Sequence, residues 1–460
     1  MKKYHLVIYA LYCLGIGKAG AQYNVLHNFN DTNGANPRFG SLTSSGGVLY
    51  GMTQSGGSNK SGVIFSINMN GSGYNNLHNF LDTTGDAPCG SLTLYRNKFY
   101  GMTLLGGAYN HGTIFSIDIN GSGYKVLNDS IIYEPAGSLI FSGNELYGMS
   151  IVGGLGNIFS IDTDGTRAKT LFNFSIPTGG EPLGSLILSN GKLFGMTPNW
   201  GGVFTTCGSI FSTDTNGSTF KDLFIFDGIT GDGANGDLTL SGSKLYGLTS
   251  NGGSTYVNQS SAGYGCVFSI DSNGNGYKDL FNFNDTNGGD PNGSLVLLGN
   301  KLYGLTQVGG VYGDGRIFSI DTNGGGFKDL FDFNGANGRW PEGTLTLSGG
   351  VFYGMTTLGG IDNDGVIFSF KDTSTGISKI PQVSSSINLY PNPSKGIFTV
   401  ESVAQISSIE IENVLGQKIY FSKINSEKAE INLSNQSKGI YFTKIIFEDE
   451  SISVGKLIIK

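Results

Sequence analysis

One five-residue pattern recurs seven times along the chain and restricts its fold more than any other feature. The pattern is Leu-Tyr-Gly-Met-Thr or a close variant, and its copies lie about 50 residues apart. A Gly-Ser-Leu-like strand precedes each copy, and Ile-Phe-Ser-Ile-like and Tyr-Lys-Asp-Leu-Phe-like strands follow it. Four short strands per unit, repeated seven times, predict a seven-bladed β-propeller. The copies are Leu49–Thr53, Phe99–Thr103, Leu146–Ser150, Leu193–Thr197, Leu245–Thr249, Leu302–Thr306 and Phe352–Thr356.

The composition agrees with an all-β fold. Glycine accounts for 75 of 460 residues, aromatic residues for 12% and charged residues for only 14%. Many glycines among aromatic and β-branched residues indicate short strands joined by tight turns. A mostly helical or disordered chain is therefore excluded.

The last repeat lacks a fourth strand. It ends at Ile367–Phe370, whereas a matching strand stands alone at Tyr23–Phe29. We expect this N-terminal strand to complete the seventh blade, because a closed ring leaves no strand edge exposed.

Loop lengths distinguish the two faces of the predicted ring. The spacing from Gly40 to Gly51 is eleven positions, and the same spacing holds in all seven repeats. The connection from the second strand to the third varies instead, from 9 positions (Met149 to Ile158) to 19 (Leu248 to Val267). We call the face with these connections the variable face and the opposite one the turn face. Because functional loops concentrate where length varies, the variable face is the candidate binding surface.

The repeats resemble kelch-type propeller repeats and, more closely, the bacterial Gloeo/Verruco repeat. The likeness rests on the order Leu-Tyr-Gly-Met-Thr, Gly-Gly and Ile-Phe-Ser-Ile-Asp-Thr-Asn-Gly, and it covers about residues 23–372. It implies the propeller fold and nothing about activity, because propellers have many unrelated functions.

The two ends of the chain carry different signals. Residues 1–21 have a basic start, an apolar run and Ala19-Gly20-Ala21, which predicts a secretory signal peptide. We place the propeller at 22–372, a linker at 373–386 and a small β-sandwich at 387–460. The motifs of this last segment, Leu389–Pro393 among them, resemble the C-terminal sorting domain of type IX secretion substrates.

That resemblance implies contact of residues 387–460 with the type IX machinery and a secreted or outer-membrane cell-surface location. Whether the domain is removed, releasing the protein, or anchors it stays open. We expect a monomer. The region between the signal peptide and residue 380 has 17 basic and 27 acidic residues, so nucleic acid is excluded as a partner.

Signals for chemistry are sparse. No metal-binding Cys/His spacing, nucleophile elbow or phosphate loop is present, and no catalytic residue is assigned. We predict no metal or cofactor, and calcium at Asp271–Gly276 or Asn284–Asn287 is left as an alternative to tight turns. Cys207 and Cys266 occupy similar places in consecutive repeats, and we favour free thiols over a bridge.

Aromatic residues give the clearest candidate site. They fall in variable-face loops, beside Asn, Asp and Arg, as in sugar- and peptide-binding sites. An equal alternative is that the rings pack loops onto neighbouring blades. Blades 4 and 5, with the long loops Trp200–Gly208 and Gly252–Gly265, are the favoured location. The candidate binding residues are Trp200, Trp340, Tyr256, Tyr264, Tyr109 and Arg339.

The sequence therefore predicts a secreted or surface-displayed propeller that acts as a binding or adhesion module for an extracellular glycan or protein. One alternative is a carbohydrate-active hydrolase or lyase with two acidic residues meeting at the mouth of the channel. A structural surface component is the second alternative. Uniform blades favour binding.

Overall fold

A computed structural model describes residues 22–130, 132–151, 153, 155–175, 178–198, 207–257, 262–373, 388–413, 418–447 and 452–460. The chain divides into two compact units, Met1–Asp372 and Thr373–Lys460. The predicted signal peptide and nearly all of the predicted linker lie outside the described residues. Among those described, no helix is long and apolar enough to cross a membrane.

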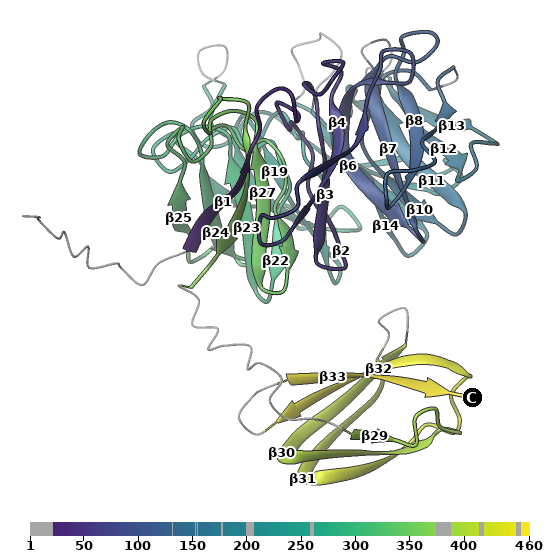
Figure 1. Cartoon of the computed structure of the whole chain (residues 1–460). Coiled ribbons are helices and arrows are strands. Elements are labelled where there is room, and N and C mark those ends of the chain that lie inside the picture. The colour runs from purple at the N-terminus through teal and green to yellow at the C-terminus, as the bar shows by residue number, and fades with distance from the viewer. Residues whose placement is uncertain are drawn as a thin grey trace, which may run out of the picture. The chain divides into compact units, whose positions relative to one another are not determined.

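Within the described residues, the first unit contains seven four-stranded antiparallel sheets, which are the blades of a propeller (Figure 1). The fold class predicted from the repeats is confirmed. The first three blades are β2 (Thr43–Ser45), β3 (Val48–Thr53), β4 (Val63–Asn68) and β5 (Asn75–Asn79); β6 (Asp86–Tyr95), β7 (Lys98–Leu105), β8 (Thr113–Asp118) and β9 (Lys125–Asn128); and β10 (Pro135–Ser142), β11 (Glu145–Ser150), β12 (Asn157–Asp162) and β13 (Lys169–Asn173).

The other four blades follow the same order. They are β14 (Ile187–Ser189), β15 (Lys192–Thr197), β16 (Ser209–Asp214) and β17 (Lys221–Ile225); β18 (Thr239–Ser241), β19 (Lys244–Thr249), β20 (Cys266–Asp271) and β21 (Lys278–Asn282); β22 (Val296–Leu298), β23 (Lys301–Thr306), β24 (Arg316–Asp321) and β25 (Lys328–Asp332); and β26 (Thr346–Ser348), β27 (Val351–Thr356), β28 (Val366–Lys371) and β1 (Gln22–Asn28).

The N-terminal strand closes the ring as expected. β1 pairs antiparallel with β28, with Tyr23 opposite Phe370 and His27 opposite Ile367. The seventh sheet therefore joins the two ends of the propeller, and its outer strand comes from the start of the repeat region.

Stacked aromatic rings hold neighbouring blades together at their outer strands. Phe172 stacks on Phe220 with ring centroids 3.8 Å apart, and His27 stacks on Tyr74 at the same distance. His27 and His78 thus take the place of Phe in this contact, and burial lowers the pKa of both imidazoles. They act as packing rings at positions that hold Phe in other blades.

The axis of the ring is formed by one glycine from each blade. An added Cβ on Gly293 would overlap the carbonyl oxygen of Gly343 in the next blade, and each of the seven glycines has this relation to its neighbour. Only glycine lets the seven strands approach so closely. The seven are Gly40, Gly90, Gly137, Gly184, Gly236, Gly293 and Gly343.

The residue after each axial glycine links its blade to the next. The backbone N–H of Ser91 donates to Ser138 Oγ at 2.8 Å, and that of Ser138 donates to Ser185 Oγ at 2.8 Å. In blade 5 the position is Asp237, whose Oδ1 accepts from Ser185 N at 2.5 Å. The result is a ring of polar side chains immediately inside the ring of glycines.

The C-terminal unit is the predicted small all-β domain. Its strands β29 (Asn388–Tyr390), β30 (Ile397–Asn413), β31 (Lys418–Asn432), β32 (Gly439–Phe447) and β33 (Ile452–Ile459) form one antiparallel sheet. Register shifts in the long strands β30 and β31 let this sheet bend around a single core that includes Phe398, Ile409 and Leu457.

Three cysteines of the propeller are free thiols. Cys89 and Cys266 are buried and Cys207 is half-buried, so the structure agrees with the interpretation that no bridge joins Cys207 to Cys266.

One blade contains a buried cation, Arg316, and no other Lys or Arg is buried among the propeller residues that the structure describes. Arg316 begins β24, with 5% of its side chain exposed, and its Nη2 lies 3.2 Å from Asp329 Oδ2 and 2.8 Å from Asp332 Oδ1. Burial raises the pKa of the Asp329 carboxyl to about 6, against the opposing effect of Arg316. The equivalent positions of blade 5 are Cys266, Asp279 and Asn282.

We expect Gly293→Ala to destabilise the propeller by about 3 kcal/mol or more, the upper part of the range for overpacking, because a backbone carbonyl cannot rotate away. Urea unfolding followed by tryptophan fluorescence measures this, since both tryptophans lie in the propeller. Gly325→Ala is the control, because its Cβ would meet only the end of the Asn323 side chain, at 3.2 Å. Equal stability of the two variants would contradict the axial packing.

We expect Arg316→Val to lower the free energy of unfolding by about 3–5 kcal/mol at pH 7, because two carboxylates lose their shared cation. The loss should shrink at pH 5, because carboxyl groups with raised pKa values take up protons in the folded state as the pH falls. Adding Asp332→Asn recreates the polar pair of blade 5, in which Asn282 donates to Asp279, and should recover much of the loss. The measurement is urea unfolding of both variants at the two pH values, and a loss independent of pH would refute the interpretation.

Candidate functional site

The channel along the axis is nearly closed and opens toward the variable face. The space within it has a volume of about 30 Å³ and is lined by the glycines, the hydroxyl side chains that follow them, Asp237 and Glu342. That volume holds about two water molecules at roughly 10–15 Å³ each. A sugar ring cannot enter it, so any ligand rests on its mouth.

The mouth has an apolar half and a polar half. The residue before each axial glycine is apolar in blades 1 to 4 and polar in blades 5 to 7. Such an arrangement suits a ligand with one apolar face and a hydroxyl-bearing edge. These residues are Phe39, Cys89, Ala136 and Leu183 in the first group, and Asn235, Asn292 and Glu342 in the second.

Hydrogen bonds join the polar half into one network. Asn235 Nδ2 donates to Asn292 Oδ1 at 2.8 Å, and Asn292 Nδ2 donates to Gln307 Oε1 at 2.7 Å. Gln307 Nε2 donates in turn to Glu342 Oε1 at 2.5 Å. Arg38 Nε donates to the other oxygen of Glu342 at 2.7 Å. The network therefore runs across blades 5, 6 and 7 and ends in blade 1.

Phe39 is the unusual residue of this mouth. Blade 1 has two residues between its proline and its axial glycine, Arg38 and Phe39, whereas blades 2, 3, 4, 6 and 7 have one, and blade 5 has Ala234 in place of the proline. Phe39 has a φ of 57°, is 38% exposed, and lies 4.5 Å beneath the Arg38 guanidinium. A large side chain in the left-handed region is strained by about 1–3 kcal/mol, and such strain clusters at functional sites.

Trp340 and Arg339 form a similar pair in blade 7. The Arg339 guanidinium lies 4.3 Å from the centre of the Trp340 ring, and its Nε is 3.1 Å from Asp314 Oδ1. Trp340 has a φ of 55°, as does its counterpart in every blade to within about 15°, so the repeat itself explains this conformation. The half-buried indole lies two residues before Glu342 in the chain.

The other residues predicted for the site are placed in separate loops. Tyr256 packs over Gly228 and Tyr264 over Gly289, so the packing alternative describes these two half-buried rings. Tyr109 is 63% exposed in the loop between β7 and β8 of blade 2. Trp200 lies outside the described residues.

Two carboxyl groups line the axial space, but neither is free for acid–base chemistry. Glu342 is 3% exposed and is held by Arg38, Gln307 and Thr357, whose Oγ1 is 3.0 Å away. Burial raises the pKa of Asp237, and its hydrogen bonds to Ser185 act in the opposite direction. Glu342 lies in the variable-face connection between β25 and β26. Asp237 was missed from the sequence, although an acid replacing Ser or Thr after the axial glycine was a visible signal.

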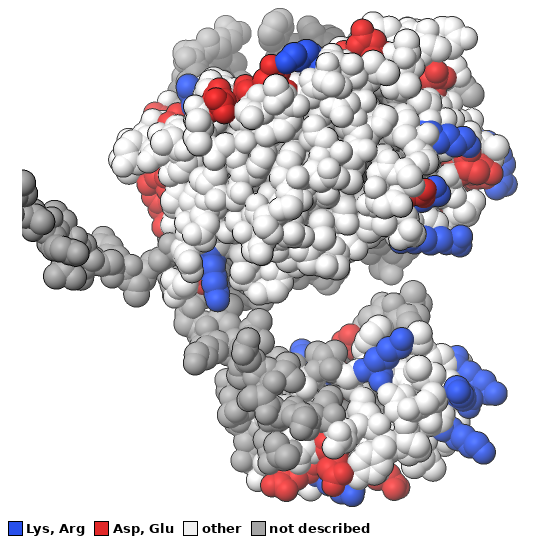
Figure 2. All heavy atoms as spheres, viewed as in Figure 1, with Lys and Arg blue, Asp and Glu red and all other residues white. Residues whose placement is uncertain are grey.

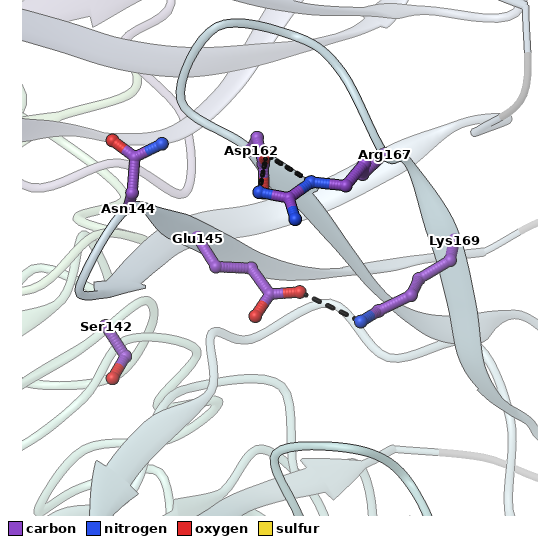
Figure 3. Close-up of a pocket in the computed structure, with 6 residues that line it drawn as sticks. All are labelled: Ser142, Asn144, Glu145, Asp162, Arg167 and Lys169. Carbon is purple, nitrogen blue, oxygen red and sulfur yellow. Dashed lines mark hydrogen bonds and ion pairs between the residues drawn. The ribbon is translucent and has the colours of Figure 1, made fainter.

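A second hollow, of about 290 Å³, lies on the turn face of blade 3 (Figure 3). Glu145 and Asp162 face each other across β11 and β12, where blades 2, 5 and 6 have a Lys–Asp pair. Arg167 pairs with Asp162 at 2.5 Å and Lys169 with Glu145 at 3.1 Å. Each carboxylate thus has its own cation, so the cluster compensates for a reversed charge and is not a candidate catalytic pair.

Within the part of the chain that the structure describes, no group of three or more His, Cys, Asp or Glu side chains is placed to hold a metal ion. At Asp271–Gly276 the backbone makes the bonds of a tight turn, with Gly274 N donating to Asp271 O at 2.8 Å.

Comparisons with known proteins agree with the two-part architecture. A family model described as the Gloeobacter/Verrucomicrobia repeat matches residues 12–131, 132–259 and 254–400. A second model, the secretion system C-terminal sorting domain, matches residues 388–460. The ulvan lyase NLR42 of Nonlabens ulvanivorans is 34% identical over 89 residues, which are 19% of this chain and only 16% of that protein.

Solved structures show the same fold at low identity. An oligogalacturonate lyase in complex with manganese has a TM-score of 0.51 and 10% identity, covering 76% of this chain and 93% of that one. PorZ, a surface component of the type IX secretion system of Porphyromonas gingivalis, has a TM-score of 0.47 and 14% identity. That match covers 92% of this chain and 59% of PorZ. Likeness at these identities concerns the fold alone.

We expect Glu342→Gln to lower the free energy of unfolding by about 1.5–3 kcal/mol, the range for hydrogen bonds to a charged group, because an amide cannot accept from all three donors. Urea unfolding measures the loss. Asp290→Asn, which removes a charge from the neighbouring blade outside this network, serves as the matched control. A Glu342→Gln variant as stable as that control would mean that the network does not organise the mouth.

Proposed function

Because the chain belongs to the Gloeobacter/Verrucomicrobia repeat family and carries a type IX sorting domain that directs it to the cell surface or beyond, we propose that its propeller binds an extracellular glycan at the mouth of the axial channel. The observation that carries the proposal is that Phe39, which is exposed and has a strained backbone, lies at the same mouth as the side-chain amides of the polar half. Phe39 offers a flat apolar surface for a pyranose ring. The amide hydrogens of Asn235 and Asn292 are used within the network, so the side-chain oxygens of Asn235, Asn292 and Gln307 are the groups that can accept from ligand hydroxyls.

Trp340 extends this surface on the blade 7 side. Arg38 and Arg339 each stack on the aromatic residue that follows them and each pair with a carboxylate, so they hold the two rings in place. Of the residues predicted from the sequence, Trp340 and Arg339 belong to the proposed site. Tyr109, Tyr256 and Tyr264 would meet only a ligand that extends outward over blades 2 and 5.

The alternative of a hydrolase or lyase has one specific observation in its favour, the 89-residue likeness to an ulvan lyase. Catalysis by paired carboxyl groups requires an acid and a base that a substrate can reach. Glu342 is saturated by three donors and Asp237 lies inside a space too small for a sugar ring. Binding without cleavage therefore accounts better for the mouth.

The proposal is tested with the full-length secreted protein carrying Trp200→Phe, in which Trp340 is the sole tryptophan. Titration with laminarin, galactomannan, hydroxyethyl cellulose or chitosan should give a saturable change in its fluorescence for at least one polymer. Phe39→Ala in this background should weaken that binding about tenfold or more, because burying an aromatic side chain is worth about 1.5–3 kcal/mol.

Tyr312→Ala is the matched control. Tyr312 is 62% exposed on the same face, but it lies at the tip of the loop between β23 and β24, and its loss should leave the affinity unchanged. Equal weakening by both substitutions, or a flat response to every polymer, would refute the proposed site. Chromatography of the same samples shows whether the polymer is cut, which would restore the enzyme alternative.

A further inference from the structure

Negative charge dominates the variable face. The connections that form it contain fourteen acidic residues and three basic ones, an excess of eleven negative charges. Figure 2 shows acidic side chains along the loops at the top of the propeller. The three basic residues are Arg38, Lys60 and Arg339.

Each of these three cations is already paired with a carboxylate. Arg38 binds Glu342, Lys60 binds Asp31 and Arg339 binds Asp314. A carboxylate or sulfate group on a ligand would therefore have to displace an existing partner, and the displaced acid would add to the repulsion.

Two acids of the variable-face connections, Asp232 and Asp290, are partly desolvated. Burial is the largest influence on the carboxyl groups of Asp232 and Asp290, and it raises the pKa of both. When charges of one sign line a hollow with low-dielectric walls, the electrostatic potential inside the hollow is stronger than on an open surface. A polyanion that approaches the mouth is therefore repelled. At ordinary salt this repulsion has a range of about 8–10 Å, beyond which the ions of the solution screen it.

What the mouth offers instead is hydrogen bonding to uncharged groups. The axial space holds about two water molecules, and hydroxyl and amide side chains line it. A ligand hydroxyl in this space can hydrogen-bond to the hydroxyl and amide groups that line it, whereas an anionic group would lie next to Asp237 and Glu342.

We propose that the glycan bound at this mouth carries neither carboxylate nor sulfate groups, and that it places a hydroxyl in the axial space. This inference rests on the proposed function and names the substrate class of the same site. A neutral glycan and an amino-substituted one share this chemistry, and the experiment separates them.

The test compares hydroxyethyl cellulose with carboxymethyl cellulose, which share a backbone and differ in charge, and adds laminarin, chitosan, polygalacturonate and alginate. Affinity electrophoresis of the full-length protein at 20 mM NaCl should show retardation by at least one polymer from the uncharged or amino group. The three anionic polymers should bind at least tenfold more weakly than that polymer. Chitosan binding that disappears in 500 mM NaCl would identify the amino-substituted class.

A charge-reversed variant tests the cause. Glu181→Lys with Asp290→Lys changes two acids that occupy, in blades 4 and 6, the position of Trp340 before the proline, and binding of carboxymethyl cellulose at 20 mM NaCl should rise at least threefold. Asp164→Lys with Asp214→Lys makes the same change in net charge on the turn face and should have no such effect.

The outcomes separate this inference from the proposed function. Tight, salt-sensitive binding of an anionic polymer to the unmodified protein would overturn the inference alone, provided that Phe39→Ala still weakens it. If uncharged polymers bind and Phe39→Ala does not weaken their binding, the proposed site is wrong, but the inference that the glycan carries no carboxylate or sulfate groups stands. Binding of none of the six polymers, nor of galactomannan, would overturn both.

Discussion

The close approach of seven strands at the axis is the constraint on which the rest of the propeller depends. Each axial glycine touches the backbone of the next blade. In blades 2 to 7 the hydroxyl or carboxyl group after it accepts a hydrogen bond from the preceding blade. A side chain on any of these glycines would force the blades apart and open the channel. The same contact that closes the ring therefore reduces the axial space to a volume that admits hydroxyl groups but no sugar ring.

Much of the fold follows from the sequence because each blade repeats the same local solution. The Leu-Tyr-Gly-Met-Thr strand, the constant turns and the displaced strand Tyr23–Phe29 together specify the number of blades and the way in which the ring closes. His27 and His78 were recognisable as packing residues because their sister positions are Phe. Equivalent positions in the seven repeats make equivalent packing contacts, so the role of one residue can be predicted from the residues at the same position in other repeats.

The site was less predictable, because it depends on departures from the repeat whose consequences are not local. An aromatic residue in a long loop can pack or protrude, and the sequence cannot distinguish the two: Tyr256 and Tyr264 pack against neighbouring backbone. Trp340 was found because tryptophan is rare in this chain. Phe39 was missed, although one extra residue before Gly40 was visible, because the strain that the insertion creates appears only in the backbone.

Departures from the repeat are of two kinds: those that are compensated by other residues of the same blade, and those that are not. Arg316 with its two aspartates, and Glu145 with Lys169, are charge changes whose partners lie within the same blade. In each case the charges are paired with opposite charges of the same blade, so no ligand is needed to explain them. Phe39 is different: its left-handed backbone is strained, its ring is exposed, and its support comes from Glu342 in another blade through Arg38. A costly conformation held by the closed ring, with an apolar surface left open beside side-chain oxygens that can accept further hydrogen bonds, is the departure from the repeat on which the proposed glycan site rests.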